Sequence, residues 1–136
     1  MTNLGLFIAR LMMSLVFLMS GLDKALHWSA GLAEIEAAGL PLARWALAAT
    51  VIVQLGGGLP LALGLWMRLG ALALAGFTVL ATVLFHDFWN ATGETWQHHF
   101  TTFMEHVAIV GGFLAIMVTG PGAFSVDRLI RWRSVT

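Results

Sequence analysis

Four long apolar stretches dominate the pattern of hydrophobic and polar positions along the chain. Each has roughly the 17–25 residues that an α-helix needs to cross the hydrocarbon core of a bilayer. Strands of a membrane barrel would instead alternate apolar and polar residues over about 10 positions. The pattern therefore predicts an all-α integral membrane protein, a four-helix transmembrane bundle that forms one domain over residues 1–136. The predicted spans cover residues 4–24, 42–66, 69–86 and 103–119.

The segments between the predicted spans differ in length and in charge. Residues 25–41 and 87–102 form two long loops on one side of the bundle, whereas only a few residues join the second span to the third. The side with the short connection and the tail, residues 120–136, has more Lys and Arg than the loop side. Cytoplasmic segments carry such an excess. We therefore expect both termini in the cytoplasm and both long loops on the outer face. The basic residues counted are Arg68, Arg128, Arg131 and Arg133 on the inner side, and Lys24 and Arg44 on the outer side.

Composition narrows the class of protein further. Hydrophobic residues make up 59% of the chain and charged residues only 10%, and the net charge is zero. Soluble domains have about 25% charged residues. These values exclude a soluble enzyme, a disordered chain and a nucleic-acid binder, which would need a basic surface. The chain has no Cys, which excludes disulfides, thiolate metal sites and iron–sulfur clusters.

Each predicted span has one stripe of small and polar residues at helical spacing. Small residues let helices approach closely in a membrane, and polar side chains find partners only inside a bundle. We therefore predict that these stripes face inward, although packing alone accounts equally well for their Gly, Ala, Ser and Thr positions. The stripes are Arg10, Ser14, Phe17, Gly21 and Lys24; Thr50, Gln54, Gly57, Leu61 and Gly64; Ala71, Ala75, Thr78, Thr82 and His86; and Thr101, Glu105, Ala108, Gly112, Ala115 and Thr119.

Ionisable residues inside a span are costly and by default mark a site. Arg10 is expected either to extend its long side chain to the cytoplasmic interface or to pair with Asp127, which follows the last span. At the outer end, Lys24 and Glu105 fall on inward stripes at the same depth, which predicts a buried ion pair. His86 falls on the third stripe at this depth as well.

The outer end is therefore the predicted place of a ligand-binding or proton-handling site. Its candidate residues are Lys24, Gln54, His86, Glu105 and His106. The sequence identifies no catalytic residue, because it contains no nucleophile elbow, phosphate loop or dinucleotide motif.

A bound metal is not expected. No H-E-x-x-H spacing occurs, and adjacent residues such as Glu105 and His106 point about 100° apart on a helix. The nearest approach to a ligand set is His86 with His98 and His99.

Several segments carry a family resemblance. They are Arg10 with FLMSGLDKALH (17–27), QLGGGLPLALGLWMRLGALAL (54–74), LFHDFWN (84–90) and FMEHVAIVGGFLAIMVTGPGAFSVD (103–127). The most distinctive are S-G-x-x-K, from Ser20 to Lys24, and GPG-x-x-S-x-D, from Gly120 to Asp127. In these segments the chain resembles the DoxX family of small bacterial inner-membrane proteins. The resemblance implies a four-helix bundle in the inner (cytoplasmic) membrane. The chain departs from the family at the start of the fourth span, where Glu105-His106 replaces the usual Lys-Asn pair.

The resemblance also implies a link to redox chemistry, since some DoxX proteins resemble membrane subunits of thiosulfate:quinone oxidoreductase. The first hypothesis is a subunit or accessory component of a larger membrane redox complex, in contact with lipid and with other membrane or periplasmic subunits. The alternative is a quinone-linked oxidoreductase subunit that binds a quinone within the bundle. A small-solute or ion carrier is a weaker hypothesis, because four helices without an internal repeat do not match the usual transporter plan.

Overall fold

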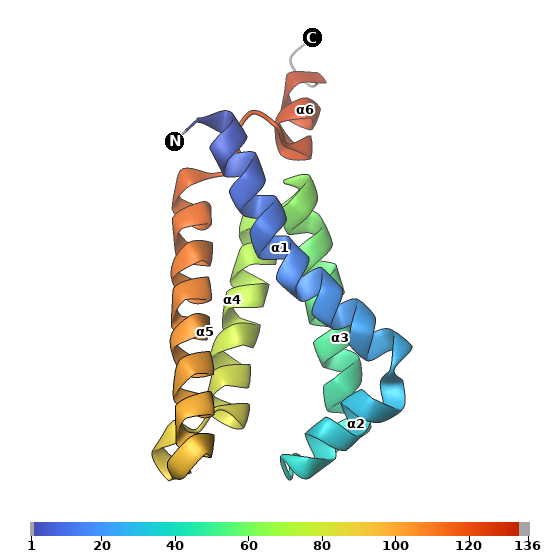
Figure 1. Cartoon of the computed structure of the whole chain (residues 1–136). Coiled ribbons are helices and arrows are strands. Elements are labelled where there is room, and N and C mark those ends of the chain that lie inside the picture. Colours follow the sequence, from blue (N-terminus) through green and yellow to red (C-terminus); the bar gives the residue numbers. More distant parts are fainter. Residues whose placement is uncertain (1, 134–136) are drawn as a thin grey trace.

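The computed structural model describes residues 2–133, and within them the protein is helical throughout (Figure 1). Four helices in this part of the chain are long and apolar enough to cross a membrane. They are α1, α3, α4 and α5, and they confirm the predicted all-α membrane bundle. The elements are α1 (Asn3–Leu26), α2 (Trp28–Ala37), α3 (Ala43–Leu63), α4 (Met67–Phe85), the 3₁₀ turn η1 (Phe88–Asn90), α5 (Gly93–Thr119) and α6 (Val126–Arg133).

Two segments outside the predicted spans contain short helices that the apolar pattern did not predict. The short helix α2 lies within residues 25–41, and α6 lies within the tail. Helix α5 begins at Gly93, whereas the apolar pattern placed the start of the fourth span at residue 103. With 27 residues it is about 40 Å long, which exceeds the hydrocarbon thickness of about 30 Å. Its polar first turns therefore extend beyond the apolar segment, which is all that a hydrophobicity pattern detects.

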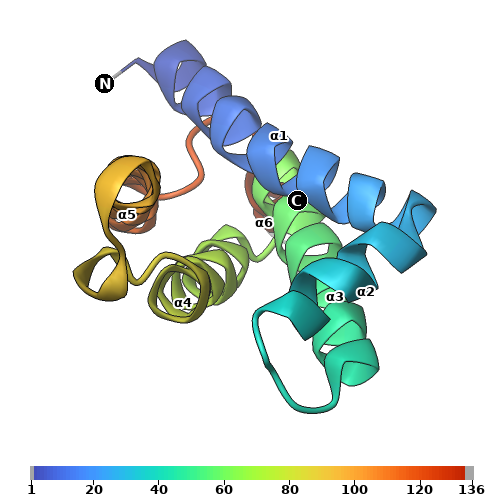
Figure 2. The same ribbon diagram turned by 60° about the horizontal axis from the view of Figure 1, so that its bottom comes forward.

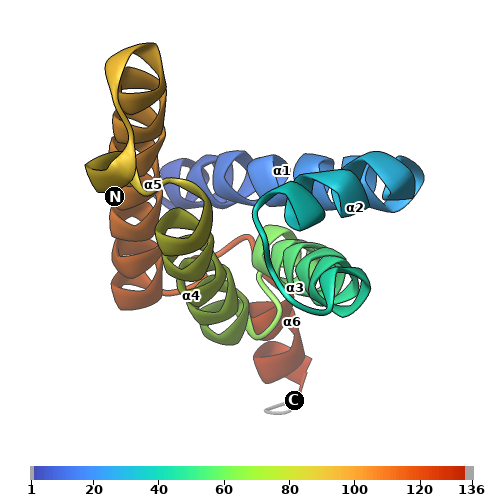
Figure 3. The same cartoon turned by 90° about the horizontal axis from the view of Figure 1, so that it is seen from below.

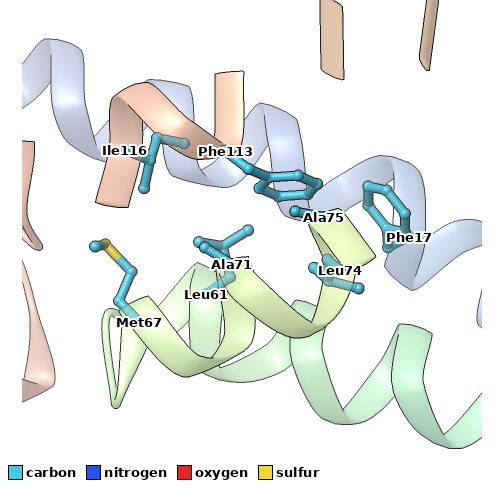
Figure 4. Close-up of a cluster of buried hydrophobic side chains, with 8 residues drawn as sticks. All are labelled: Phe17, Leu61, Met67, Ala71, Leu74, Ala75, Phe113 and Ile116. Carbon is cyan, nitrogen blue, oxygen red and sulfur yellow. The ribbon is translucent and has the colours of Figure 1, made fainter. Parts of the chain in front are cut away.

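The long helices pack in the order α1, α3, α4, α5, and each contacts the next. Helix α2 lies across the ends of α1 and α3 (Figure 2). One buried cluster joins all four long helices (Figure 4), and in it the rings of Phe17 and Phe113 lie 5.4 Å apart, centre to centre. The cluster consists of Phe17, Leu61, Met67, Ala71, Leu74, Ala75, Phe113 and Ile116.

The inward stripes predicted for the first three spans are confirmed, because they form the buried faces of α1, α3 and α4. The stripe predicted for the fourth span is wrong. Glu105, Ala108 and Thr119 are exposed, and the inward face of α5 instead carries Phe113 and Ile116. Helix α5 meets α1 through Phe113, whose ring packs on Phe17, and through Gly112 of the predicted stripe, which packs against Met13.

Helices α3 and α4 touch through two glycines, Gly57 and Gly70. A Cβ atom on Gly70 would lie 2.8 Å from the carbonyl oxygen of Gly57, and one on Gly57 would lie 2.8 Å from Leu74 Cγ. The two backbones are therefore in direct contact near the turn that joins the helices. From this point α3 and α4 separate toward the end where α2 lies (Figure 1).

Replacing Gly70 by alanine should push α3 and α4 apart, because the atom in the way is backbone and cannot rotate aside. We expect the free energy of unfolding to fall by about 1–3 kcal/mol, the usual cost of overpacking. SDS titration of the protein in mild detergent, followed by tryptophan fluorescence, measures this change. Gly56→Ala is the matched control, since no atom lies within 4 Å of a Cβ there. Equal effects of the two substitutions would contradict the proposed contact.

The buried side chain of Arg10 fastens the segment between α5 and α6. Arg10 is only 1% exposed. Its Nη1 donates to the carbonyl oxygen of Pro121 at 2.8 Å, and its Nη2 donates to that of Phe124. Carbonyl groups beyond a helix end have no partner within that helix, and a guanidinium group supplies several donors at once. Arg10 thus reaches from α1 to the segment that follows the last long helix.

Asp127 holds the same segment from the other side. Its carboxylate accepts from the backbone N–H of Trp66 at 3.1 Å, and its own N–H donates to the carbonyl of Gly64 at 3.1 Å. Among the described residues, Arg10 and Asp127 do not form the predicted ion pair, because carbonyl and amide groups occupy both side chains. Gly64 is essential here: a Cβ would collide with the Arg10 guanidinium and lie 2.6 Å from Ser125 Cβ.

Arg10→Met should leave the partly buried carbonyls of Pro121 and Phe124 without their charged donor. Each hydrogen bond to a charged group contributes about 1.5–3 kcal/mol, so we expect the free energy of unfolding to fall by about 3 kcal/mol. Arg44→Met, at an exposed position of α3, should change it by less than about 0.5 kcal/mol. The SDS titration measures both. A loss for Arg10→Met no larger than that for Arg44→Met would show that Arg10 does not fasten the segment.

Candidate functional site

A pocket of about 650 Å³ lies where the helices separate, at the α2 end of the bundle. Helices α1, α3 and α4 form most of its wall, and α2 and α5 contribute at its end. This volume lies within the range of about 300–1,000 Å³ that is usual for small-molecule sites. Most lining side chains are apolar, as is typical of such sites. The polar lining residues are Ser20, Lys24, Glu34, Thr50, Gln54, Thr78, His86 and His106.

Lys24 reaches the pocket from the last turn of α1, where it pairs with Glu34 of α2. Lys24 Nζ lies 3.1 Å from Glu34 Oε2, and the two side chains are 23% and 56% exposed. The predicted Lys24–Glu105 pair is therefore wrong: Glu105 is exposed on α5, outside the pocket lining. The reason is the position of α2, which folds back against α3 so that Ile35 is buried. This packing brings Glu34 to Lys24, and helical periodicity could not have indicated it.

Gln54 is the most deeply buried polar side chain of the pocket after Thr78, with an exposed fraction of 5%. Its Nε2 donates to Ser20 Oγ at 3.1 Å. Its Oε1 is buried and has no hydrogen-bond partner among the described residues. Buried polar atoms in proteins are nearly always paired. The Gln54 oxygen is therefore an unpaired acceptor buried in the wall of the pocket.

His106 reaches the pocket from α5 and is held by Thr82 of α4. Its Nδ1 lies 2.7 Å from Thr82 Oγ1, and the Thr82 hydroxyl lies 2.6 Å from the carbonyl oxygen of Thr78. A hydroxyl has one hydrogen and a carbonyl has none, so Thr82 donates to Thr78 and accepts from His106. Neutral His106 then carries its hydrogen on Nδ1, which leaves Nε2 as an acceptor.

His86, the residue that follows α4, lies beside His106 with ring centres 5.1 Å apart. His99 lies on its other side at 5.7 Å. His86 Nδ1 is buried and, like Gln54 Oε1, has no partner in residues 2–133. His98 is exposed and contacts His99 rather than His86. Within the same residues, no three His or carboxylate side chains are arranged to hold a metal ion.

The pocket thus brings together four of the five predicted ligand-binding candidates, Lys24, Gln54, His86 and His106. Sequence reasoning missed the parts that Glu34 and Thr82 play. Thr82 stood on a predicted inward stripe, and its spacing from Thr78 was the available signal. Glu34 gave no such signal, because its place depends on how α2 packs.

Comparison with known proteins places the chain in a family. The family model described as DoxX matches residues 5–87. The chain belongs to the DoxX family. The match covers α1 to α4 and includes Lys24, Gln54 and His86, whereas His106 lies beyond it. The chain is thus a DoxX-family integral membrane protein, as the quoted segments indicated.

Two relatives from Escherichia coli (strain K12) are similar over nearly their whole length. Inner membrane protein YqjF is 35% identical over 128 residues, which cover 94% of this chain and 93% of YqjF. Inner membrane protein YphA is 29% identical over 123 residues, which cover 90% of this chain and 88% of YphA. No solved structure matches the chain. The similarity therefore extends through α5, past the segment that the family model covers.

Thr82→Val should remove the acceptor that fixes the His106 tautomer. In protein with ¹⁵N-labelled histidine, ring nitrogen NMR shifts should show neutral His106 protonated at Nδ1 in the original protein. In Thr82→Val a population protonated at Nε2 should appear. Thr102→Val removes a similar hydroxyl from α5, one that donates to the His98 carbonyl outside the pocket, and should leave the His106 signals unchanged. A His106 already protonated at Nε2 in the original protein would mean that Thr82 donates to the ring.

Proposed function

We propose that this protein is a quinone-binding component of a larger membrane redox complex and that its pocket takes the quinone ring. The observation that carries the proposal is Gln54. It is a buried amide with an unpartnered oxygen in the wall of a mostly apolar cavity of about 650 Å³. Sites for small molecules combine an apolar lining with a few convergent polar groups of this kind.

The polar groups of the pocket fit a quinone in both of its oxidation states. A quinone ring is flat and apolar and carries carbonyl oxygens, which accept hydrogen bonds. The Lys24 ammonium group and an imidazole N–H can donate to them. The reduced form carries hydroxyl groups, which need acceptors. Gln54 Oε1 and His106 Nε2 can serve as those acceptors.

The histidines of the pocket are suited to transfer protons during quinone reduction. Reduction of a quinone to a quinol takes up two electrons and two protons. His86 and His106 line the pocket, and imidazole exchanges protons near neutral pH. His99 lies beside His86 at the same end, so a chain of imidazoles extends from the pocket toward the first turns of α5.

Electrons would come from a partner, which is why we propose membership of a complex. The chain has no cysteine with which to hold an iron–sulfur cluster of the common type. We also propose that the protein lies in a bacterial inner membrane, as the names of YqjF and YphA state for those relatives. The excess of Lys and Arg then favours cytoplasmic termini, with the pocket toward the outer face.

Gln54→Leu should weaken quinone binding at least about 10-fold, which corresponds to about 1.4 kcal/mol, because the ring loses its buried polar contact. Binding is measured on protein purified in mild detergent, by equilibrium dialysis with a short-chain ubiquinone analogue. Gln97→Leu, at an exposed position of α5, should have no effect.

One further variant and one observation sharpen this test. Like Gln54→Leu, Ser20→Ala removes the hydrogen bond between Gln54 and Ser20, but it keeps the Gln54 oxygen. This variant should therefore retain most of the affinity for the quinone analogue. If the original protein binds no quinone, or if Gln54→Leu binds as well as Gln97→Leu, the pocket is not a quinone site. Native electrophoresis of the same preparation should show partner chains, and a lone protein would contradict membership of a complex.

A further inference from the structure

The pocket has an open side between α3 and α4. These helices are in contact at Gly57 and Gly70 and separate toward α2. Seen from that end, α4 and α5 lie on one side and α1, α2 and α3 on the other (Figure 3). Five residues on the facing flanks of α3 and α4 both line the pocket and are exposed at the surface of the bundle. We call them the lateral gap: Ala49, Ala73, Gly76, Leu80 and Leu84.

The residues of the lateral gap that belong to α4 show where the pocket opens to the surface. The gap residues of α4 follow one another at intervals of three and four, so they share one flank of the helix. Leu72, Val79 and Val83 are also exposed but do not line the pocket. They belong to the outer flank of α4. The pocket is therefore continuous with the surface on the flank that faces α3, at the depth of the membrane-spanning segments.

The chemistry of the lateral gap matches hydrocarbon. Its side chains are apolar and mostly small, and a Cβ on Gly76 would have no atom within 4 Å. Water and charged solutes gain nothing from such a rim, whereas a lipid chain moves between the gap and the bilayer at little cost. Among the polar lining residues, Gln54 and Thr78 are buried, and the Gln54 oxygen is unpartnered.

From this arrangement we infer that the pocket is loaded from the bilayer and that the lateral gap is the subsite for the ligand's hydrocarbon tail. The inference rests on the proposed function, since it requires a polar ring near Gln54. It adds that the ligand is a membrane-resident molecule with a long chain. The chain leaves between α3 and α4 while the ring stays inside.

The test compares two ligands that share one ring, a ubiquinone analogue with a decyl chain and the ubiquinone ring without a side chain. Gly76→Trp fills the lateral gap. It should weaken binding of the decyl analogue at least about 10-fold and leave binding of the tail-free ring within about twofold. Gly56→Trp is the matched control. Gly56 is an exposed glycine of α3 with open space around it and does not line the pocket, so its affinities should not change.

Two more variants keep the inference testable if Gly76→Trp does not fold. Ala49→Trp blocks the gap from α3 and should reproduce the selective loss. Val16→Trp narrows the pocket from α1, where Val16 is an exposed lining residue, and should not discriminate between the two ligands. A selective loss in Val16→Trp with none in Gly76→Trp and Ala49→Trp would place the tail between other helices and overturn the inference. So would equal loss of both ligands in Gly76→Trp and Ala49→Trp.

The same experiment distinguishes a failure of the proposed function from a failure of the inference about the tail subsite. If the original protein binds neither ligand, the pocket is not a quinone site, and the proposed function fails before the gap is tested. If it binds both ligands and the gap variants behave like Gly56→Trp, the quinone site stands and only the tail subsite is rejected.

Discussion

The contact between Gly57 and Gly70 is the constraint on which the shape of this bundle depends. Two straight helices with inclined axes that touch near their connecting turn lie farther apart with every residue away from the point of contact. Arg10 strengthens the same end, because it binds the segment after α5 to α1. Helices α3 and α4 therefore lie close together toward the α6 end and apart at the open α2 end, where the pocket lies. The pocket therefore results from the separation of the helices. It is not a packing defect left by side chains that are too small to fill the core.

The two ends differ in how their polar groups are paired. At the α6 end, Arg10 and Asp127 bind carbonyl and amide groups of the connecting segments, and Arg10 Nε has no partner among the described residues. At the open end, Gln54 Oε1 and His86 Nδ1 remain without a protein partner. Inside a membrane an unsatisfied polar atom costs several kcal/mol. The unpaired atoms at the open end belong to Gln54 and His86, which both line the pocket.

The sequence predicts the fold well and the site in part, and the differences have one cause. Helical periodicity says which residues share a face, and in α1, α3 and α4 the small and polar face was indeed the buried one. In α5 the same rule failed, because Phe113 fills space that α1 leaves open, and Glu105 consequently lies on the exposed side. Pairings between helices, such as Lys24 with Glu34, depend on tertiary packing and leave no mark in the spacing of residues along the chain.

The position of α5 also gives the adjacent residues Glu105 and His106 different surroundings. Glu105 is exposed and does not line the pocket. His106 faces in, and Thr82 holds its Nδ1. An asparagine there would offer a fixed amide, which neither takes up nor releases a proton near neutral pH. An imidazole offers an acceptor that can become a donor. His106 therefore adds to the pocket lining an ionisable group that Thr82 holds in place.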